Sequence, residues 1–267
     1  MDLKLEGKRA LVTGSTAGIG EAIARSLARE GAALVVHGRD EQRGNQLQET
    51  LGNDGQRAVF VKADLSDPRD VHRLADEARA ALGGIDILVN NAAMYPQHTW
   101  FESGADIWSR LFEVNVMATV RLIQLRVPDM KAAGWGRVIQ ISSGEASKPF
   151  AHMPGYAATK AAINNLTVSL CQTVSDSGVT VNAISAGLIR TAEVERWFVA
   201  EAKARGGKDD WNDIEAQILK NYLSIPVGHV GTPEDVARVA TFLASPHASY
   251  INGAILRVDG GSHAWSA

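Results

Sequence analysis

Cysteine is almost absent from this chain, which has one such residue, Cys171, among its 267. A single thiol cannot form an internal disulfide, and it cannot build a zinc site based on cysteines. The composition is therefore typical of a protein that folds in a reducing compartment without covalent cross-links.

An excess of positive charge is also lacking, because 27 Lys and Arg residues are balanced by 30 Asp and Glu residues. The formal net charge of -3 creates no long-range attraction to a phosphate backbone, which argues against a nucleic-acid partner. Apolar runs stay well short of the roughly 18 residues that suggest a membrane span, and the charged first residues are unlike a secretory leader. These absences predict a cytoplasmic protein with no membrane partner.

Metal-ligand motifs are missing as well. The seven histidines are scattered and form no short-spaced pair such as a helical His-Glu-x-x-His. We therefore expect no metal site, and surface or packing roles for most of the histidines.

What the chain does contain is a regular alternation of apolar runs and helical patterns. Buried strands are predicted at 9–13, 34–36, 59–62, 85–89, 137–142, 179–184 and 255–258. Helical patterns separate them, including a long one from about 105 toward Pro128. Such alternation predicts a parallel sheet with helices on both faces, because parallel neighbours need crossover connections. We expect a single α/β domain over 1–267, a doubly wound fold with a seven-stranded parallel sheet.

One stretch, at about 192–225, interrupts this rhythm. It shows no strand pattern but two helix-like pieces, around Trp197 and Trp211, separated by the polar run 205–208. A helical substrate lid and an ordinary surface hairpin of helices are both compatible with an insertion of this length.

Glycines cluster between the first predicted strand and its helix, in Thr13-Gly-Ser-Thr-Ala-Gly-Ile-Gly20. Glycine lets the chain turn tightly and approach a ligand closely, while free N–H groups and the positive end of the helix dipole attract phosphate. A tight turn without a ligand would explain an isolated cluster equally well.

Further motifs follow in a fixed order: Asn90-Asn91-Ala92 after the fourth strand, Ser143 after the fifth, and Tyr156-x-x-x-Lys160 at the start of the next helix. Together with the glycine loop, they resemble the short-chain dehydrogenase/reductase family over nearly the whole chain, and within it the 3-oxoacyl-(acyl-carrier-protein) reductase-like branch. The resemblance implies an NAD(P)-binding Rossmann domain with a dinucleotide across the strand ends. It places at this cofactor Gly14, Ser15, Thr16, Gly18, Ile19, Gly20, Arg39, Asp64, Leu65, Asn91, Ala92, Tyr156, Lys160, Ile189 and Thr191.

The end of the second predicted strand bears on the choice between the two nicotinamide cofactors. An acidic residue there would accept hydrogen bonds from the ribose hydroxyls of NAD, whereas an arginine pairs with the 2′-phosphate of NADP. Gly38 stands at the position of the acid, and Arg39 follows it. NADP(H) is therefore favoured over NAD(H). The alternative is that Arg39 is an ordinary charged residue of the surface.

The predicted catalytic pair is Tyr156 and Lys160, which lie one turn apart on the same helix face. A free tyrosine titrates near pH 10, and a neighbouring ammonium favours the phenolate, so we expect Lys160 to lower the pKa of Tyr156. Tyr156 would then exchange the proton in the interconversion of a ketone and a secondary alcohol. Ser143 would donate a hydrogen bond to the substrate oxygen. The resemblance adds Asn115, which supports a water chain to the lysine in the family.

The substrate is the least determined part of the prediction. Position in the sequence suggests contacts from Ser143, Glu145, His152, Met153, Tyr156 and Leu188. A 3-oxoacyl thioester, a sugar or polyol, and a hydrophobic ketone all remain open, and a non-catalytic NADP-binding scaffold or sensor is the alternative to an enzyme. The resemblance also implies a homotetramer.

Overall fold

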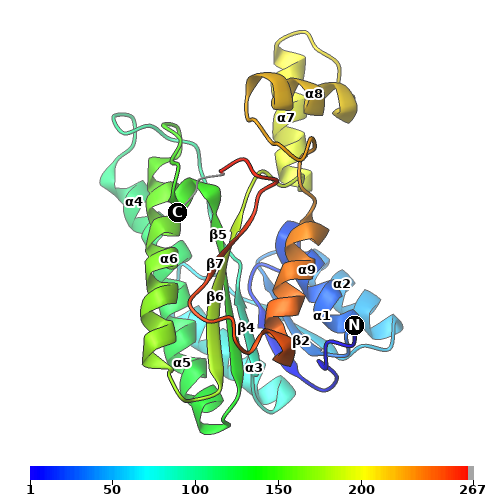
Figure 1. Cartoon of the computed structure of the whole chain (residues 1–267), viewed down its shortest axis with the longest axis vertical. Coiled ribbons are helices and arrows are strands. Elements are labelled where there is room, and N and C mark those ends of the chain that lie inside the picture. Colours follow the sequence, from blue (N-terminus) through cyan, green and yellow to red (C-terminus); the bar gives the residue numbers. More distant parts are fainter. Residues whose placement is uncertain (264–267) are drawn as a thin grey trace.

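The computed structural model describes residues 1–263 and contains seven parallel strands in one sheet, in the order β3-β2-β1-β4-β5-β6-β7 (Figure 1). The strands are β1 (Arg9–Val12), β2 (Ala33–Gly38), β3 (Ala58–Lys62), β4 (Ile87–Asn90), β5 (Gly136–Ser143), β6 (Val179–Ala186) and β7 (Ile255–Val258). All neighbouring strands pair in parallel, so each connection crosses over the sheet.

Helices cover both faces of the sheet. They are α1 (Gly18–Arg29), α2 (Glu41–Asn53), α3 (Pro68–Leu82), α4 (Ala105–Phe112), α5 (Ala118–Ala132), α6 (Pro154–Thr173), α7 (Ala192–Ala204), α8 (Trp211–Asn221) and α9 (Pro233–Ala244). One apolar core lies under α1, α2 and α9, and the other under α3, α5 and the end of α6. The predicted fold class, a doubly wound α/β Rossmann fold with a seven-stranded parallel sheet, is confirmed.

The strands are largely apolar because they contribute to both cores. On β1, Val12 packs into the first core and Leu11 into the second, and both are fully buried. Alternate side chains of a strand point to opposite faces, so a sheet covered on both sides favours apolar residues on both faces of each strand. Each such side chain contributes about 1.5–3 kcal/mol by leaving water.

The long helical region expected from about 105 toward Pro128 contains an irregular turn in its middle. The helix α4 ends at Phe112, a π-helical turn spans Glu113–Met117, and α5 continues through Pro128. A π-turn inserts one residue into a helix and leaves the apolar periodicity on either side almost unchanged. The spacing of apolar residues in the sequence therefore does not reveal it. The turn contains Asn115.

The helices α7 and α8 stand beyond the carboxyl ends of the strands, at the top of Figure 1. They have an apolar cluster of their own, which includes Phe198, Trp211, Ile214 and Ile218. Both helices fall within the stretch at 192–225 that the sequence separates from the strand-helix alternation.

None of the helices within residues 1–263 combines the length and the apolar character needed to cross a bilayer.

Candidate active site

A cleft of about 830 Å³ runs along the carboxyl ends of the strands. The strand order reverses between β1 and β4, and doubly wound sheets bind their ligands outside such a point. Most residues expected at the cofactor line this cleft, and only Ser15 and Gly20 lie beneath its surface. Those that line it are Gly14, Thr16, Gly18, Ile19, Arg39, Asp64, Leu65, Asn91, Ala92, Tyr156, Lys160, Ile189 and Thr191.

The glycine loop adopts backbone angles that other residues avoid. Gly14 and Gly18 have φ values of +63° and +56°. A Cβ on Gly20 would lie 2.3 Å from the carbonyl oxygen of Gly14, so the chain closes on itself here. The helix α1 begins without a side-chain cap at Ala17. Its first N–H groups are therefore available to a phosphate group, and the cradle fits the dinucleotide that the sequence predicts.

Two side chains hold this loop in place. The amide nitrogen of Asn91 donates to the carbonyls of Thr13 and Gly14, at 2.9 and 3.1 Å. The N–H of Gly14 donates to Nδ1 of His37 at 3.0 Å, while Nε2 of that ring lies 3.2 Å from the Ala63 carbonyl. The carbonyl can only accept, so the proton is assigned to Nε2.

Burial keeps this histidine neutral, because it lowers the pKa of His37 to about 4. Only the neutral imidazole has an unprotonated nitrogen that can accept the hydrogen bond from the N–H of Gly14. Sequence reasoning missed this role, since one histidine at the end of a strand carries no motif.

Basic side chains line the end of the cleft beyond β2. Arg39 and Arg43 are both there, with Asp64 opposite. A Cβ on Gly38 would lie 2.5 Å from Oγ1 of Thr16, so the acid that recognises the ribose of NAD would fit at position 38 only if the threonine side chain moved. Arg43 is a second cation that the sequence analysis did not single out.

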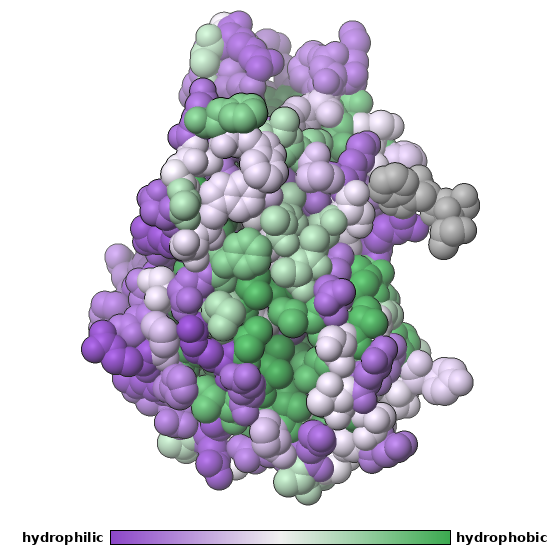
Figure 2. All heavy atoms as spheres, turned by 90° about the vertical axis from the view of Figure 1, so that its left-hand side faces the viewer, coloured by the Kyte–Doolittle hydropathy of each residue, from purple (hydrophilic) through white to green (hydrophobic). Residues whose placement is uncertain are grey.

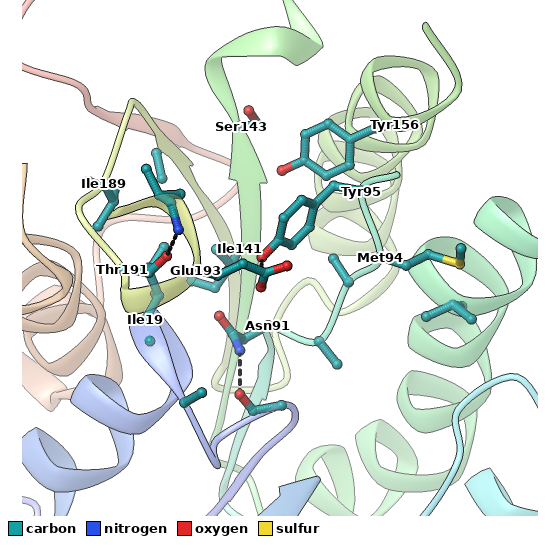
Figure 3. A pocket seen from close by; sticks show the side chains of 18 of the residues that line it. Ile19, Asn91, Met94, Tyr95, Ile141, Ser143, Tyr156, Ile189, Thr191 and Glu193 are labelled. Atoms are coloured by element: carbon teal, nitrogen blue, oxygen red, sulfur yellow. Dashed lines mark hydrogen bonds between the residues drawn. The ribbon is translucent and has the colours of Figure 1, made fainter. Parts of the chain in front are cut away.

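The catalytic candidates meet where this cleft passes the end of β5. Ser143 is the last residue of β5, and Tyr156 lies in the first turn of α6. Figure 3 shows both side chains facing the same pocket from these two elements. Nζ of Lys160 lies 5.6 Å from the centroid of the Tyr156 ring and donates to the carbonyl of Ile141 at 2.6 Å.

The expected lowering of the tyrosine pKa is not seen in this arrangement. Burial raises the pKa of Tyr156, although a hydrogen bond to Ser143 opposes the shift. Burial also lowers the pKa of Lys160 to about 8. The physical reason is burial, which removes the hydration that a phenolate needs, while the ammonium lies beside the ring and is bonded to a backbone carbonyl.

Asn115 connects the loop after β4 to α6. Its Oδ1 accepts from the N–H of Met94 at 2.8 Å, and its Nδ2 donates to the Met94 carbonyl at 2.9 Å and to Thr159 Oγ1 at 3.0 Å. Thr159 in turn donates to the carbonyl of Tyr156 at 2.7 Å. The side chain therefore positions the tyrosine helix, and its role in a water chain stays a prediction.

A second pocket, of about 460 Å³, opens between the end of β5, the helix α7 and the residues Tyr222 and Leu223 just after α8. The expected substrate residues Ser143, Glu145, His152, Met153 and Leu188 line it, and Tyr156 lies in the adjoining cleft. Residues of the stretch at 192–225, from which the sequence also suggests substrate contacts, line it too: Glu193, Val194, Trp197, Phe198, Tyr222 and Leu223. Gln97, Phe150 and His263 are lining residues that were not assigned from the sequence.

A hydrogen bond crosses the boundary between the cleft and this pocket. The hydroxyl of Tyr95, after β4, donates to Glu193 in the first turn of α7 (Figure 3). The ring of Tyr95 lies edge-on to Tyr156, with centroids 6.0 Å apart. At the same end of α7, Thr191 accepts from the N–H of Val194 at 3.2 Å and caps the helix. The start of α7 is thus hydrogen-bonded to a side chain that packs against Tyr156.

Among residues 1–263, no group of three or more His, Cys, Asp and Glu side chains is arranged to hold a metal ion.

The chain matches a known family model over most of its length. The model, described as enoyl-(acyl carrier protein) reductase, covers residues 14–263. The chain is 39% identical to the uncharacterized oxidoreductase YvaG of Bacillus subtilis, over 98% of both chains. It is 33% identical to the 3-oxoacyl-[acyl-carrier-protein] reductase FabG of Aquifex aeolicus, over 98% of this chain and 99% of the other.

A solved structure is similar over the full length. The L-sorbose reductase of Gluconobacter frateurii, complexed with NADPH and L-sorbose, superimposes with a TM-score of 0.94. It is 34% identical to this chain, and the match covers 100% of both.

Proposed function

The chain belongs to the short-chain dehydrogenase/reductase family of oxidoreductases that act on CH–OH and C=O groups, and from this premise we propose that it interconverts a ketone and a secondary alcohol with NADP(H). The observation that carries the proposal is the position of Ser143 and Tyr156, where the cofactor cleft meets the second pocket. A carbonyl held there would face two hydroxyl groups.

Each catalytic side chain has a distinct part in this proposal. When bound, the nicotinamide supplies a hydride to the carbonyl carbon or accepts one from the alcohol. Tyr156 delivers the proton to the carbonyl oxygen, and in the reverse direction it accepts that proton. Ser143 donates a hydrogen bond to the same oxygen and stabilises its negative charge. Lys160 keeps a positive charge beside the phenol ring, and Asn115 positions the helix that carries both.

The preference for NADP(H) is supported by the basic end of the cleft. Arg39 and Arg43 are arranged to pair with a 2′-phosphate, and Thr16 fills the space that an acidic residue at position 38 would need. The structurally similar L-sorbose reductase was solved with NADPH.

Substituting Arg39 by alanine tests this preference. We expect KM for NADPH to rise about 10- to 100-fold, because a charge-assisted hydrogen bond to the phosphate is lost. KM for NADH should change little, since NADH has no 2′-phosphate. Initial rates with both cofactors measure the difference. Arg69→Ala, which removes a 91% exposed side chain on α3, is the matched control. Equal losses with both cofactors, or a wild-type preference for NADH, would contradict the assignment.

We propose that α7 and the segment just after α8 form the substrate lid, because Trp197, Phe198, Tyr222 and Leu223 line the second pocket and α8 packs against α7 in one apolar cluster. The names of the relatives suggest test substrates from different chemical classes, namely L-sorbose and 3-oxoacyl thioesters. Measuring the reduction of such ketones through the consumption of NADPH tests the proposed reaction.

We also propose a homotetramer in the cytoplasm. Apolar residues gather on the face shown in Figure 2, over α4, α5 and α6. Exposed apolar side chains of these helices and of the π-turn between α4 and α5 are Phe112 at 38%, Met117 at 39% and Val168 at 42%. Apolar patches of this kind commonly mark interaction sites. Light scattering should give a mass four times that of the 28.5 kDa chain, and a monomer peak would contradict the assembly.

A further inference from the structure

Aromatic side chains gather in the lining of the second pocket. Five of them form what we call the aromatic wall: Tyr95, Phe150, Trp197, Phe198 and Tyr222. Three members keep much of their surface accessible, since Tyr95 is 41%, Trp197 38% and Tyr222 41% exposed. Accessible apolar side chains that line a hollow are typical of a binding site. The aromatic wall therefore offers a ligand apolar surface beside the reacting groups.

Contacts between rings connect the aromatic wall from the end of β5 to α7. The centroid of the Tyr222 ring lies 6.1 Å from that of Phe150, after β5, and 5.5 Å from that of Phe198, on α7. Trp197 lies 4.4 Å from Phe198 and 6.3 Å from Tyr222, and His152 stacks on Phe150 at 5.4 Å. Tilted and edge-on arrangements prevail, which are those that aromatic pairs prefer, and a ring of the substrate can join the cluster in the same way.

Several polar groups of the lining are closed off or already bonded. Oε2 of Glu145 and Nε2 of His263 have almost no accessible surface, so neither atom is open to a ligand. The Tyr95 hydroxyl donates to Glu193, and these two groups therefore satisfy each other. The surface that the pocket presents to a substrate is accordingly mainly apolar.

The charge of the pocket disfavours anionic substrates. Glu145 and Glu193 both line it, and none of its described lining residues is Lys or Arg. Burial raises the pKa of Glu145 to about 7, so this carboxyl carries a partial negative charge at neutral pH. A carboxylate on the substrate would meet two acidic side chains and no cation to pair with.

The position of the pocket fixes which part of a ketone would reach the aromatic wall. Ser143 lines both the cofactor cleft and the second pocket, and Tyr156 lines the cleft beside it. With its carbonyl oxygen at these two hydroxyls, a ketone extends one substituent into the second pocket. The volume of about 460 Å³ is ample for a single ring at this place.

We propose that this pocket selects uncharged ketones with an aromatic ring near the carbonyl, and that Trp197 and Tyr222 recognise the ring by packing against it. The inference rests on the proposed ketone–alcohol interconversion and names the substrate class of that same site. An aromatic ring gains from leaving water and also from contacts with other rings, whereas an alkyl group gains only from leaving water.

Four methyl ketones test the proposal. They are phenylacetone, its saturated analogue cyclohexylacetone, 2-butanone, which has no ring, and 4-(2-oxopropyl)benzoate, which carries a carboxylate on the ring. In each of them the carbonyl lies between a methyl and a methylene group, so the reactivity of the carbonyl itself is similar.

The expected order follows from apolar burial, ring contacts and charge. With NADPH, kcat/KM for phenylacetone should exceed that for 2-butanone by about 10- to 100-fold, because a buried ring leaves water. It should exceed that for cyclohexylacetone by about 2- to 10-fold, because only the aromatic ring gains the contacts between rings. The benzoate should be reduced about 10-fold less efficiently than phenylacetone, or worse.

Variants then assign the selectivity to the aromatic wall. Trp197→Leu keeps an apolar side chain without a ring, and it should lower the ratio of kcat/KM for phenylacetone over 2-butanone by about 5- to 10-fold. Tyr222→Leu should act in the same direction from the other side of the pocket. Trp197→Phe keeps a ring and should hold the ratio within about threefold of wild type. Trp100→Leu is the control, because this tryptophan is 64% exposed and lines neither pocket.

A binding measurement gives a second readout that does not need turnover. In a Tyr156→Phe background with NADPH, calorimetry should show that Trp197→Leu weakens phenylacetone binding by about 5-fold or more. Unchanged binding would overturn the role of Trp197.

The outcomes separate this inference from the proposed function. Equal kcat/KM for phenylacetone and cyclohexylacetone, preferred reduction of the benzoate, or an equal loss on all ketones in Trp197→Leu would overturn the inference and leave the reductase activity in place. Reduction of the reactive reference ketone 2,3-butanedione without reduction of phenylacetone would do the same. If wild-type protein reduces none of the five ketones, the proposed function fails together with the inference.

Discussion

A Tyr156→Phe variant should lose about 1,000-fold or more in kcat for ketone reduction. The substitution removes the hydroxyl that transfers the proton and keeps the ring that packs beside Tyr95 and Lys160. The Kd for NADPH should therefore stay within about twofold of wild type, because the change affects the transition state rather than cofactor binding. Initial rates and a fluorescence titration with NADPH measure the two quantities.

Two contrary results would be informative in different ways. Retained turnover in Tyr156→Phe would remove this residue as the proton donor. NADPH binding by the wild-type protein without turnover of any ketone in a broad panel would favour the alternative, a non-catalytic NADP-binding scaffold or sensor.

A Gly20→Ala variant should bind NADPH about 100-fold more weakly than wild type, although it adds only one methyl group. The new Cβ would lie 2.3 Å from the Gly14 carbonyl oxygen and 2.4 Å from Nδ2 of Asn91. The backbone of the glycine loop has to move, and the hydrogen bonds from Asn91 that hold it are lost. Overpacking of this kind also costs about 1–3 kcal/mol of folding stability. NADPH titration and urea unfolding measure the two effects.

Gly52 offers a matched control in α2. A Cβ there would meet no atom within 4 Å. Gly52→Ala should therefore raise the free energy of unfolding by about 0.5–1 kcal/mol, since alanine restricts the unfolded chain more than glycine does, and should leave NADPH binding unchanged. Wild-type affinity in Gly20→Ala would show that this loop does not hold the cofactor.

The sequence predicted the architecture well because the deciding signals are local. Strands buried on both faces are predominantly apolar, and amphipathic helices separate them, so the order of elements follows from periodicity. The relation of Tyr156 to Lys160 is equally local, because residues four apart on a helix share a face. Ser143 was found through the order of motifs, and the structure brings it to the same pocket as Tyr156.

What the sequence did not reveal depends on contacts between distant segments. His37 acts on the glycine loop from 23 residues away, and Glu193 meets Tyr95 across 98 residues. His263 reaches the end of β5 from beyond β7. The direction of the Lys160 ammonium was missed for a related reason, since helical spacing fixes which face a side chain occupies and says nothing about which acceptor it finds.

The packing of Thr16 against Gly38 limits how cofactor preference could change in this lineage. An aspartate introduced at position 38 alone would collide with the threonine side chain, whose Oγ1 lies 2.5 Å from the site of the new Cβ. The threonine side chain would have to move aside, so substitutions at positions 16 and 38 should not be additive. Redesign of this protein toward NAD should therefore vary the two positions together.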